Sequence, residues 1–287
     1  MSHNKPLVSF LVLCYNHEDF VSDCLNSIIN QSYTEYEVII CDDCSVDASV
    51  PLIQKQKKKF DEKNIRFVVM ENQENQGITK NINRMLKEAH GKYIKIFASD
   101  DILFEEYLSE MVPILEGKES LQFVFSNGIK IREEAHYPVK KEYETGLLLA
   151  DIPDYKFDCF QKIYMNNFIP APTTLFRKSV LEELGGYDES IGIEDLEMSL
   201  RILQKYPHGA EYYQDPTVYY RINANSVTST KYNKGLLKRA KFMYMNRVAI
   251  AKKYKNYVSR KMYWRKILSL RLAYIITKKN AFLHRWL

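Results

Sequence analysis

Apolar runs alternate with stretches of helical spacing through the first hundred positions of the chain. The unbroken apolar run at 8–14 predicts a strand covered on both faces, because a half-exposed strand would alternate with polar residues. Apolar positions over 18–31 then recur at helical intervals. Further strands are predicted at 37–41, at 65–70 and from 93, and further helices at 45–60 and 78–90. Strands alternating with helices predict an α/β fold with a mainly parallel central sheet.

The second half of the chain has a less regular pattern. Helices are predicted at 105–115, 177–184 and 194–206, and short strands at 122–126 and 173–176. Gly185 and Gly186 are suited to end the helix before them, since glycine readily takes the left-handed backbone of a helix C-terminus. The remaining segment, 132–153, has no clear periodicity and is expected to form a loop or flap.

Polar side chains stand directly after three predicted strands: Tyr15, Asp43 and Asp101. Right-handed crossovers bring the carboxyl ends of parallel strands to one rim, where ligands bind in open α/β sheets. The adjacent carboxylates of Asp100 and Asp101 repel each other unless a cation sits with them. Oxygen ligands suit Mg²⁺ or Mn²⁺, and such ions commonly carry phosphates. The alternative is a solvated turn, for which Ser-Asp-Asp is equally suitable.

Charge is divided unevenly along the chain. The 287 residues can form one large core, or one core with an appendage, and the net charge is +5. Residues 231–287 hold 17 Lys or Arg and no Asp or Glu, which leaves −12 on residues 1–230. We therefore predict a globular domain at 1–230 and a basic helical extension at 231–287. Such an extension favours contact with an anionic surface, either membrane or nucleic acid.

Five scattered cysteines favour a reducing compartment over a disulfide framework. Cys41 and Cys44 have the spacing of a zinc pair, but no second pair follows, so we expect free thiols.

No stretch reaches the roughly 18 uncharged apolar residues of a membrane span. Lys5 and the apolar run after it mimic a short signal peptide. No small-residue cleavage site follows, and we expect a buried first strand instead.

Several short motifs follow one another in order over residues 6–230. They are Val8-Ser9, Tyr15-Asn16, Asn30-Gln31-Ser32-Tyr33, Asp42-Asp43-Cys44-Ser45-Val46-Asp47, Asn75-Gln76-Gly77, Ala89-His90-Gly91-Lys92-Tyr93-Ile94, Ser99-Asp100-Asp101, Gly185-Gly186-Tyr187-Asp188 and Glu194-Asp195. Each alone is weakly diagnostic. The ordered set resembles the inverting family 2 glycosyltransferases of the GT-A fold, which build bacterial surface polysaccharides. The resemblance implies a Rossmann-like nucleotide-diphospho-sugar transferase domain.

The resemblance also implies a role for single residues at the donor site. Tyr15 would stack on the pyrimidine of a nucleoside diphosphate sugar, Asp43 would accept the imide hydrogen of that base, and the backbone at Leu13 would line the pocket. Uridine diphosphate sugars are favoured as donors. Thymidine diphosphate rhamnose is the close alternative.

The family's metal-binding motif corresponds to Ser99-Asp100-Asp101. There Asp101 would bind Mn²⁺ or Mg²⁺, and Asp100 would bind the ribose or a sugar hydroxyl. Lys80 could reach the diphosphate or the sugar, or could be an ordinary solvated helix lysine. In place of the histidine that many members carry in an Arg-x-His segment, this chain has Asn223, a poor metal ligand.

The same resemblance assigns the general base to Asp195, with Glu194 as the runner-up. An inverting transfer needs one base that takes the proton of the acceptor hydroxyl while its oxygen attacks the anomeric carbon. A helix N-terminus favours the ionised carboxylate. Alternatively, both acids merely cap that helix. The acceptor would be a saccharide linked to a polyprenyl diphosphate, in capsule, O-antigen or exopolysaccharide synthesis.

The basic extension has two stretches of amphipathic helical spacing with interfacial aromatics among the Lys and Arg residues. This pattern is typical of membrane-surface anchors. We expect it to dock a bacterial cytoplasmic enzyme peripherally on the inner face of the cytoplasmic membrane. The alternatives are packing on the catalytic domain or a homodimer contact. A nucleic-acid-binding protein is disfavoured because the body is acidic and no nucleic-acid module is evident. A non-catalytic sugar-binding protein is the other alternative.

Overall fold

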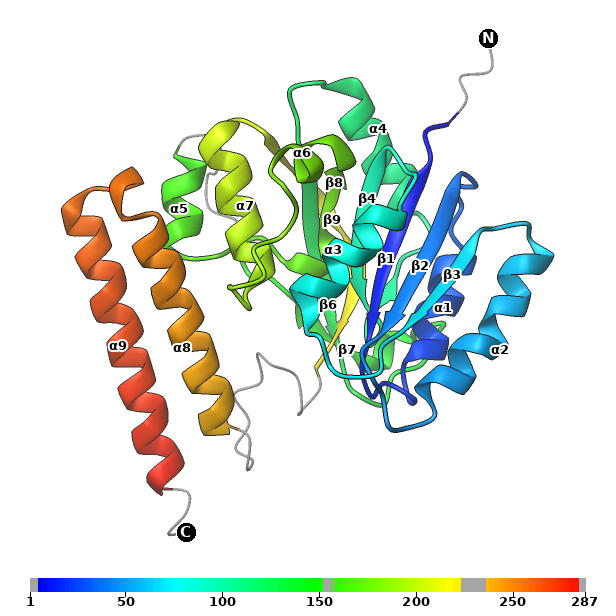
Figure 1. The fold of residues 1–287 in the computed structure, drawn as a ribbon, viewed down its shortest axis with the longest axis horizontal. Helices are drawn as coiled ribbons and strands as arrows, with labels where there is room; N and C mark the ends of the chain where they lie inside the picture. The colour runs from blue at the N-terminus through cyan, green and yellow to red at the C-terminus, as the bar shows by residue number, and fades with distance from the viewer. Residues whose placement is uncertain (1–4, 152–155, 157, 223–235, 284–287) are drawn as a thin grey trace.

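The computed structural model describes residues 5–283, except 152–155, 157 and 223–235 (Figure 1). Within these ranges, nine strands form one sheet in the order β3-β2-β1-β4-β8-β6-β9-β5, with β7 added on β6. The strands are β1 (Val8–Cys14), β2 (Tyr36–Asp42), β3 (Phe67–Glu71), β4 (Tyr93–Ala98), β5 (Ile102–Leu103), β6 (Phe123–Ile131), β7 (Glu144–Leu147), β8 (Leu175–Arg177) and β9 (Ala210–Arg221).

Helices cover both faces of the sheet, so that the fold has three layers. The helices of the described ranges are α1 (Val21–Ile29), α2 (Ser49–Glu62), α3 (Ile78–Glu88), α4 (Tyr107–Gly117), α5 (Cys159–Met165), α6 (Lys178–Glu183), α7 (Glu194–Lys205), α8 (Leu236–Lys253) and α9 (Arg260–Leu283), of which α8 and α9 lie at the outer side of the layers. Alternate side chains of β1 enter opposite layers: Phe10 packs in the core with α1, α2 and α4, and Leu11 in the core with α3, α5, α6 and α7. The α/β fold is therefore confirmed.

The two halves of the sheet are built differently. β1 to β4 are mutually parallel, as the alternating pattern predicts. Beyond β4 the pairs of β8 with β4 and β6 are antiparallel, and β9 runs parallel to β6. The sheet as a whole is mixed. The long strand β9 was not predicted, because Asp215 and Pro216 interrupt its pattern, and the register against β6 shifts at that point.

The basic extension folds into a helical hairpin of α8 and α9, joined through a short 3₁₀ turn at Lys255–Tyr257 (Figure 1). Its predicted helical character is confirmed, and the hairpin packs on the domain. Ile250 and Ile267 enter the same core as α5 and α7. Tyr164 donates a hydrogen bond from its hydroxyl to the carbonyl of Ala251 at 3.2 Å. The predicted boundary at residue 230 lies outside the described residues.

Two further predictions can be compared with the structure. All five cysteines are free thiols, as expected. Among the residues that the structure describes, no helix is both long and apolar enough to cross a membrane.

Candidate functional site

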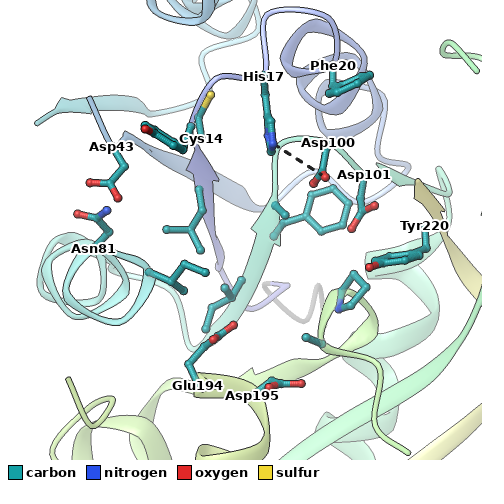
Figure 2. Close-up of a pocket in the computed structure, with 18 of the residues that line it drawn as sticks. Cys14, His17, Phe20, Asp43, Asn81, Asp100, Asp101, Glu194, Asp195 and Tyr220 are labelled. Atoms are coloured by element: carbon teal, nitrogen blue, oxygen red, sulfur yellow. Dashed lines mark ion pairs between the residues drawn. The ribbon is translucent and has the colours of Figure 1, made fainter. Parts of the chain in front are cut away.

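A cavity of about 780 Å³ opens at the carboxyl ends of β1, β2 and β4 (Figure 2). Seven of the predicted site residues line it. They are Leu13, Tyr15, Asp43, Asp100, Asp101, Glu194 and Asp195. Figure 2 shows Asp43 at one side, Asp100 and Asp101 at another, and Glu194 with Asp195 across from them on α7. The eighth, Lys80, is exposed on α3 and is not among the lining residues. The cavity therefore presents three separate acidic positions to one ligand space.

Asp43 is held by donors from the loop before α3. Its Oδ1 accepts hydrogen bonds from the side chain of Asn72 at 2.8 Å and from the backbone of Gln76 at 2.7 Å, and its Oδ2 accepts one from the backbone of Gly77 at 2.9 Å. Burial acts to raise the pKa of Asp43, but the surrounding donors outweigh it and lower the pKa. The carboxylate is therefore ionised and fixed. It lies at the cavity, where a ligand N–H can approach it.

The loop after β1 is tied to the loop after β2. Asn16 donates its backbone N–H to the hydroxyl of Ser45 at 2.8 Å, and its side-chain oxygen accepts the N–H of Val46 at 2.9 Å. These bonds fix the chain on the C-terminal side of Tyr15, whose side chain is about half exposed at the cavity. A ring in this position can stack on a planar ligand that Asp43 holds at its edge.

Asp101 is buried and is fixed by Arg221 at the end of β9. The backbone N–H of Arg221 donates to Oδ1 of Asp101 at 2.9 Å. The buried guanidinium of Arg221 donates to the carbonyls of Asp100 at 2.8 Å and Glu133 at 2.6 Å, and also to that of Ala135. Burial first, and then the charge of Asp100, raise the pKa of Asp101 well above its ordinary value. Asn223 lies outside the described residues.

His17 is a lining residue that the sequence did not single out. Its Nδ1 lies 2.8 Å from the hydroxyl of Ser99, and its Nε2 lies 4.0 Å from Oδ2 of Asp100 (Figure 2). The only signal in the sequence is its place two residues after Tyr15, at the end of the first strand. It adds an imidazole beside the two carboxylates.

The two aspartates offer hard oxygen ligands for a divalent cation. Within the described ranges, no three His, Cys, Asp or Glu side chains converge on one point. A magnesium-like ion is usually held by one or two carboxylates, with phosphates and water supplying the other ligands. Asp101 is a buried carboxylate next to a second one, so a cation there would offset the repulsion between them. The Asp100–Asp101 pair therefore fits such an ion.

Glu194 and Asp195 form the first turn of α7 and line the cavity. The side-chain amide of Asn167 donates to Oδ2 of Asp195 at 3.0 Å. Burial first, and then the charge of Asp195, raise the pKa of Glu194 to about 8. Burial also raises the pKa of Asp195, against the lowering effect of the Leu196 backbone, Asn167 and the positive charge of Arg247. The pair can therefore accept a proton near neutral pH.

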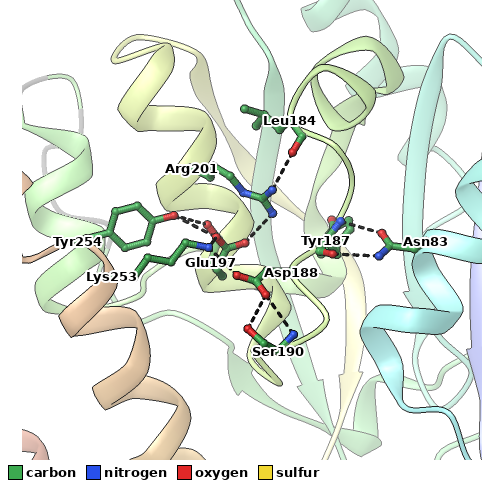
Figure 3. Close-up of polar contacts among 9 residues, drawn as sticks. All are labelled: Asn83, Leu184, Tyr187, Asp188, Ser190, Glu197, Arg201, Lys253 and Tyr254. Atoms are coloured by element: carbon green, nitrogen blue, oxygen red, sulfur yellow. Dashed lines mark hydrogen bonds and ion pairs between the residues drawn. The ribbon is translucent and has the colours of Figure 1, made fainter.

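A buried carboxylate on α7 ties this helix to the hairpin (Figure 3). Glu197 is 1% exposed and accepts hydrogen bonds from Arg201 of the same helix at 2.7 Å and from Lys253 of α8 at 2.7 Å. The hydroxyl of Tyr254 lies 3.1 Å from the same oxygen as Lys253. Lys253 also donates to Asp188 at 2.7 Å. The hairpin therefore helps to fix the helix that carries Asp195.

A second buried cation supports the cavity wall from the sheet. Lys95 of β4 is fully buried and donates its ammonium to the carbonyls of Pro172 and, at 3.4 Å, Thr174. Its Nζ lies 4.4 Å from the centre of the Tyr107 ring. Burial lowers the pKa of Lys95 well below its usual value, against the raising effect of Asp101. Lys95 thus holds the segment with Pro172 and Thr174, which lines the cavity.

Comparison with known proteins gives one family. The sequence model described as "Glycosyl transferase family 2" matches residues 9–185. TuaG of Bacillus subtilis (strain 168), whose name assigns it to teichuronic acid biosynthesis, is 32% identical over 154 residues. That alignment covers 51% of this chain and 59% of TuaG. A protein of Escherichia coli, the "UDP-Glc:alpha-D-GlcNAc-diphosphoundecaprenol beta-1,3-glucosyltransferase WfaP", is 27% identical over 226 residues, covering 79% of this chain and 81% of WfaP.

Solved structures show the same fold at low sequence identity. The mannosyltransferase PcManGT from Pyrobaculum calidifontis, solved with GDP-Man and Mn²⁺, superposes with a TM-score of 0.67 at 18% identity over 98% of this chain and 74% of that chain. TarS 1–349 of S. aureus, solved with UDP-GlcNAc, gives a TM-score of 0.61 at 19% identity over 92% of this chain and 71% of that chain. These likenesses concern the fold.

Proposed function

Because the chain belongs to glycosyl transferase family 2, we propose that it transfers a sugar from a nucleoside diphosphate donor to a saccharide acceptor by a single inverting displacement. The observation that carries this proposal is that one cavity has acidic residues at separate positions (Figure 2). Asp43, expected at the nucleotide of the donor, lies at one position, and the acid pair Glu194–Asp195 lies at another, with Asp100 and Asp101 beside them. A donor and an acceptor can then meet within one cavity.

The donor base would lie against Tyr15 with its imide N–H on Asp43. The ionised carboxylate of Asp43 accepts hydrogen bonds only, which suits the N–H of a ligand base, and Asn72, Gln76 and Gly77 hold it in place at the cavity. Uracil and thymine both carry this N–H, so uridine diphosphate sugars are favoured and thymidine diphosphate rhamnose is the alternative. The UDP-GlcNAc complex of TarS makes a uridine donor the first to test.

Asp101, with Asp100 beside it, would hold Mn²⁺ or Mg²⁺ together with the diphosphate of the donor. The ion supplies positive charge to the leaving diphosphate when it is bound. The Mn²⁺ in the PcManGT complex supports a divalent ion. Arg221 keeps Asp101 in place through its backbone N–H. His17 lies beside Asp100 and would donate a hydrogen bond to the phosphates.

Asp195 would act as the general base. It takes the proton of the acceptor hydroxyl while that oxygen forms its bond to the anomeric carbon. The bond from this carbon to the phosphate oxygen breaks at the same time, and the nucleoside diphosphate leaves with the electron pair. Asn167 orients the base through its hydrogen bond to Oδ2. Burial and the charge of Asp195 would keep Glu194 protonated over much of the neutral range, which leaves Asp195 as the ionised member of the pair.

The acceptor would be a lipid-linked saccharide of bacterial surface polysaccharide synthesis. WfaP, which aligns over 79% of this chain, is named for an acceptor on diphosphoundecaprenol. An acceptor of this kind would place the reaction at the inner face of the cytoplasmic membrane.

Ligand binding to the folded state raises the apparent melting temperature, so a thermal-shift panel tests the donor site. The panel contains Mn²⁺ with uridine, thymidine and guanosine diphosphates. A shift with uridine diphosphate that is lost in Asp43→Ala is expected. A shift with thymidine diphosphate alone would move the donor to rhamnose or a relative. No shift with any of them would favour a non-catalytic protein, and a hydrolysis assay of the matching donor sugar would then be expected to show no turnover.

A further inference from the structure

The hairpin of α8 and α9 presents two different faces. Its inner face is part of the domain, because Ile250, Tyr254 and Ile267 are almost fully buried against it. Lys266 of α9 is also on this side and donates its ammonium to the carbonyl of Met165 at 2.6 Å. Figure 1 shows α9 as the outermost helix, beyond α8. The inner contacts explain the hairpin's attachment, but they leave the outer side of α9 unaccounted for.

The outer side of α9 carries a stripe of large apolar side chains. The stripe consists of Trp264, Leu268, Leu272, Ile275 and Ile276, each between 48% and 60% exposed. Their spacing of three and four residues puts them on one face of the helix over about three turns. Contiguous exposed apolar surface of this kind marks a contact site rather than ordinary surface.

Positive charge flanks the outer stripe along the whole helix. Exposed basic side chains of α9 stand before, within and after it: Arg260, Lys261, Arg265, Arg271, Lys278 and Lys279. No Asp or Glu occurs anywhere in 231–287. A second copy of the hairpin would bring two basic surfaces together without a counter-charge. An anionic surface with an apolar interior satisfies both the charges and the stripe.

We propose that the outer stripe of α9 docks on an anionic phospholipid bilayer, with Trp264 at the level of the headgroups and the flanking Lys and Arg on the lipid phosphates. The role of this docking rests on the proposed function, since a lipid-linked acceptor would lie in the same bilayer. The evidence for the docking itself is the exposed apolar stripe of α9 and the basic residues that flank it. Because Lys253 joins the hairpin to Glu197, docking also fixes the helix of the general base relative to the membrane.

Flotation of the full-length protein with vesicles tests this docking without any donor or acceptor. Vesicles of phosphatidylglycerol mixed with phosphatidylcholine should carry the protein upward at low salt, and vesicles of phosphatidylcholine alone should not. Leu268→Glu with Leu272→Glu should abolish flotation. Each of the exposed Lys or Arg residues that flank the stripe, replaced by Gln, should weaken binding about fivefold, since a basic residue near an anionic membrane contributes about 1 kcal/mol.

Matched controls test whether flotation depends on the outer stripe and its flanking charges, rather than on any exposed leucine or any exposed lysine. Leu147→Glu changes a similarly exposed leucine on β7, and Lys55→Gln with Lys58→Gln removes two exposed charges from α2. All three substitutions should leave flotation unchanged. Trp286→Phe leaves Trp264 as the single tryptophan, and its fluorescence should shift to shorter wavelength with anionic vesicles. The thermal shift with nucleotide should persist in every α9 variant, so failure of docking and failure of donor binding remain distinguishable.

Several results would overturn the proposal. One is that the protein remains in the soluble fraction when it is mixed with anionic vesicles at low salt. Another is flotation that survives the double Glu variant. A third is a dimer in light scattering that this variant dissociates, without any vesicle binding in the parent, which would assign the stripe to a second copy of the chain.

Discussion

The side-chain amide of Asn167 donates a hydrogen bond to Oδ2 of Asp195 at 3.0 Å, although 28 residues separate the two in the sequence. One comes from the irregular segment after α5 and the other from the first turn of α7. This bond fixes one oxygen of the proposed base and lowers its pKa against the effect of burial.

Substitutions at this pair should reduce turnover to different extents. Asp195→Asn removes the base and should lower kcat by about 10²- to 10⁴-fold, the usual contribution of a positioned proton acceptor. Asn167→Ala removes only the orienting bond and should lower kcat by about tenfold to hundredfold. The thermal shift with nucleotide and Mn²⁺ should be unchanged in both variants. If Asp195→Asn retained full turnover, the base would have to be assigned elsewhere.

The pH dependence of stability should change in Glu194→Gln. The pKa of Glu194 is raised from 4.5 to about 8, so between these values the folded chain binds more protons than the unfolded chain. The free energy of unfolding therefore falls as the pH rises through this window. The neutral amide of the variant does not titrate, so this loss is absent. The difference in melting temperature, variant minus parent, should therefore increase as the pH rises from 4.5 to about 8. An unchanged difference between the two would contradict the raised pKa.

The same substitution should leave the acidic limb of the rate profile in place. The negative charge of Asp195 is one of the causes that raise the pKa of Glu194, so Asp195 loses its proton first, while Glu194 is still neutral. A neutral glutamine in place of this neutral acid changes the charge beside Asp195 little. We expect the kcat profile of Glu194→Gln to reach its plateau at the same pH as that of the parent, with Asp195→Asn showing no such limb.

Arg221 should contribute strongly to stability. Its side chain is completely buried and donates to the carbonyls of Asp100, Glu133 and Ala135, and it lies 3.8 Å from the carboxylate of Asp23. Arg221→Met leaves these groups unpaired and should cost about 3 to 5 kcal/mol of unfolding free energy in urea titrations. Arg132→Met, at an exposed position near the end of β6, is the matched control and should be close to neutral.

Lys253 should affect both stability and turnover. Lys253→Met removes a charged donor from the buried Glu197 and from Asp188, which should cost about 1.5 to 3 kcal/mol of unfolding free energy. Because Glu197 lies on the helix of the proposed base, kcat should fall while nucleotide binding is retained. Lys252→Met, at the exposed neighbouring position, should change neither quantity. Equal behaviour of the two variants would show that the network does not position α7.

The first half of the fold could be predicted because its signals are local. An apolar run such as 8–14 needs no partner to be recognised as a buried strand, and parallel topology then brings Tyr15, Asp43 and Asp101 to one rim. The order of motifs indicated the family, which the match to residues 9–185 confirms. The roles given to single site residues remain predictions.

The second half of the fold and several details of the site depend on contacts between residues far apart in the sequence, which no local pattern reveals. Strand β9 is defined by its partner β6 rather than by its own alternation, since Pro216 stands inside it. Arg221 at its end reaches Asp101 across 120 residues of sequence. Lys80 lies on the helix after the Asn75-Gln76-Gly77 loop, where a donor contact is plausible from sequence, but its side chain is exposed. Such outcomes depend on how the elements pack, which residue spacing alone does not specify.

The hairpin that closes the main core is made on the ribosome after every other element that it covers. Until Lys253 and Tyr254 emerge, the carboxylate of Glu197 lacks its partners from α8, and the apolar surface that Ile250 and Ile267 cover is open to water. Chaperone demand should therefore be high in the interval between the emergence of α7 and that of the hairpin, when the parallel half of the sheet has already emerged. A released chain truncated before α8 should be more sensitive to protease on α7 than the 287-residue chain.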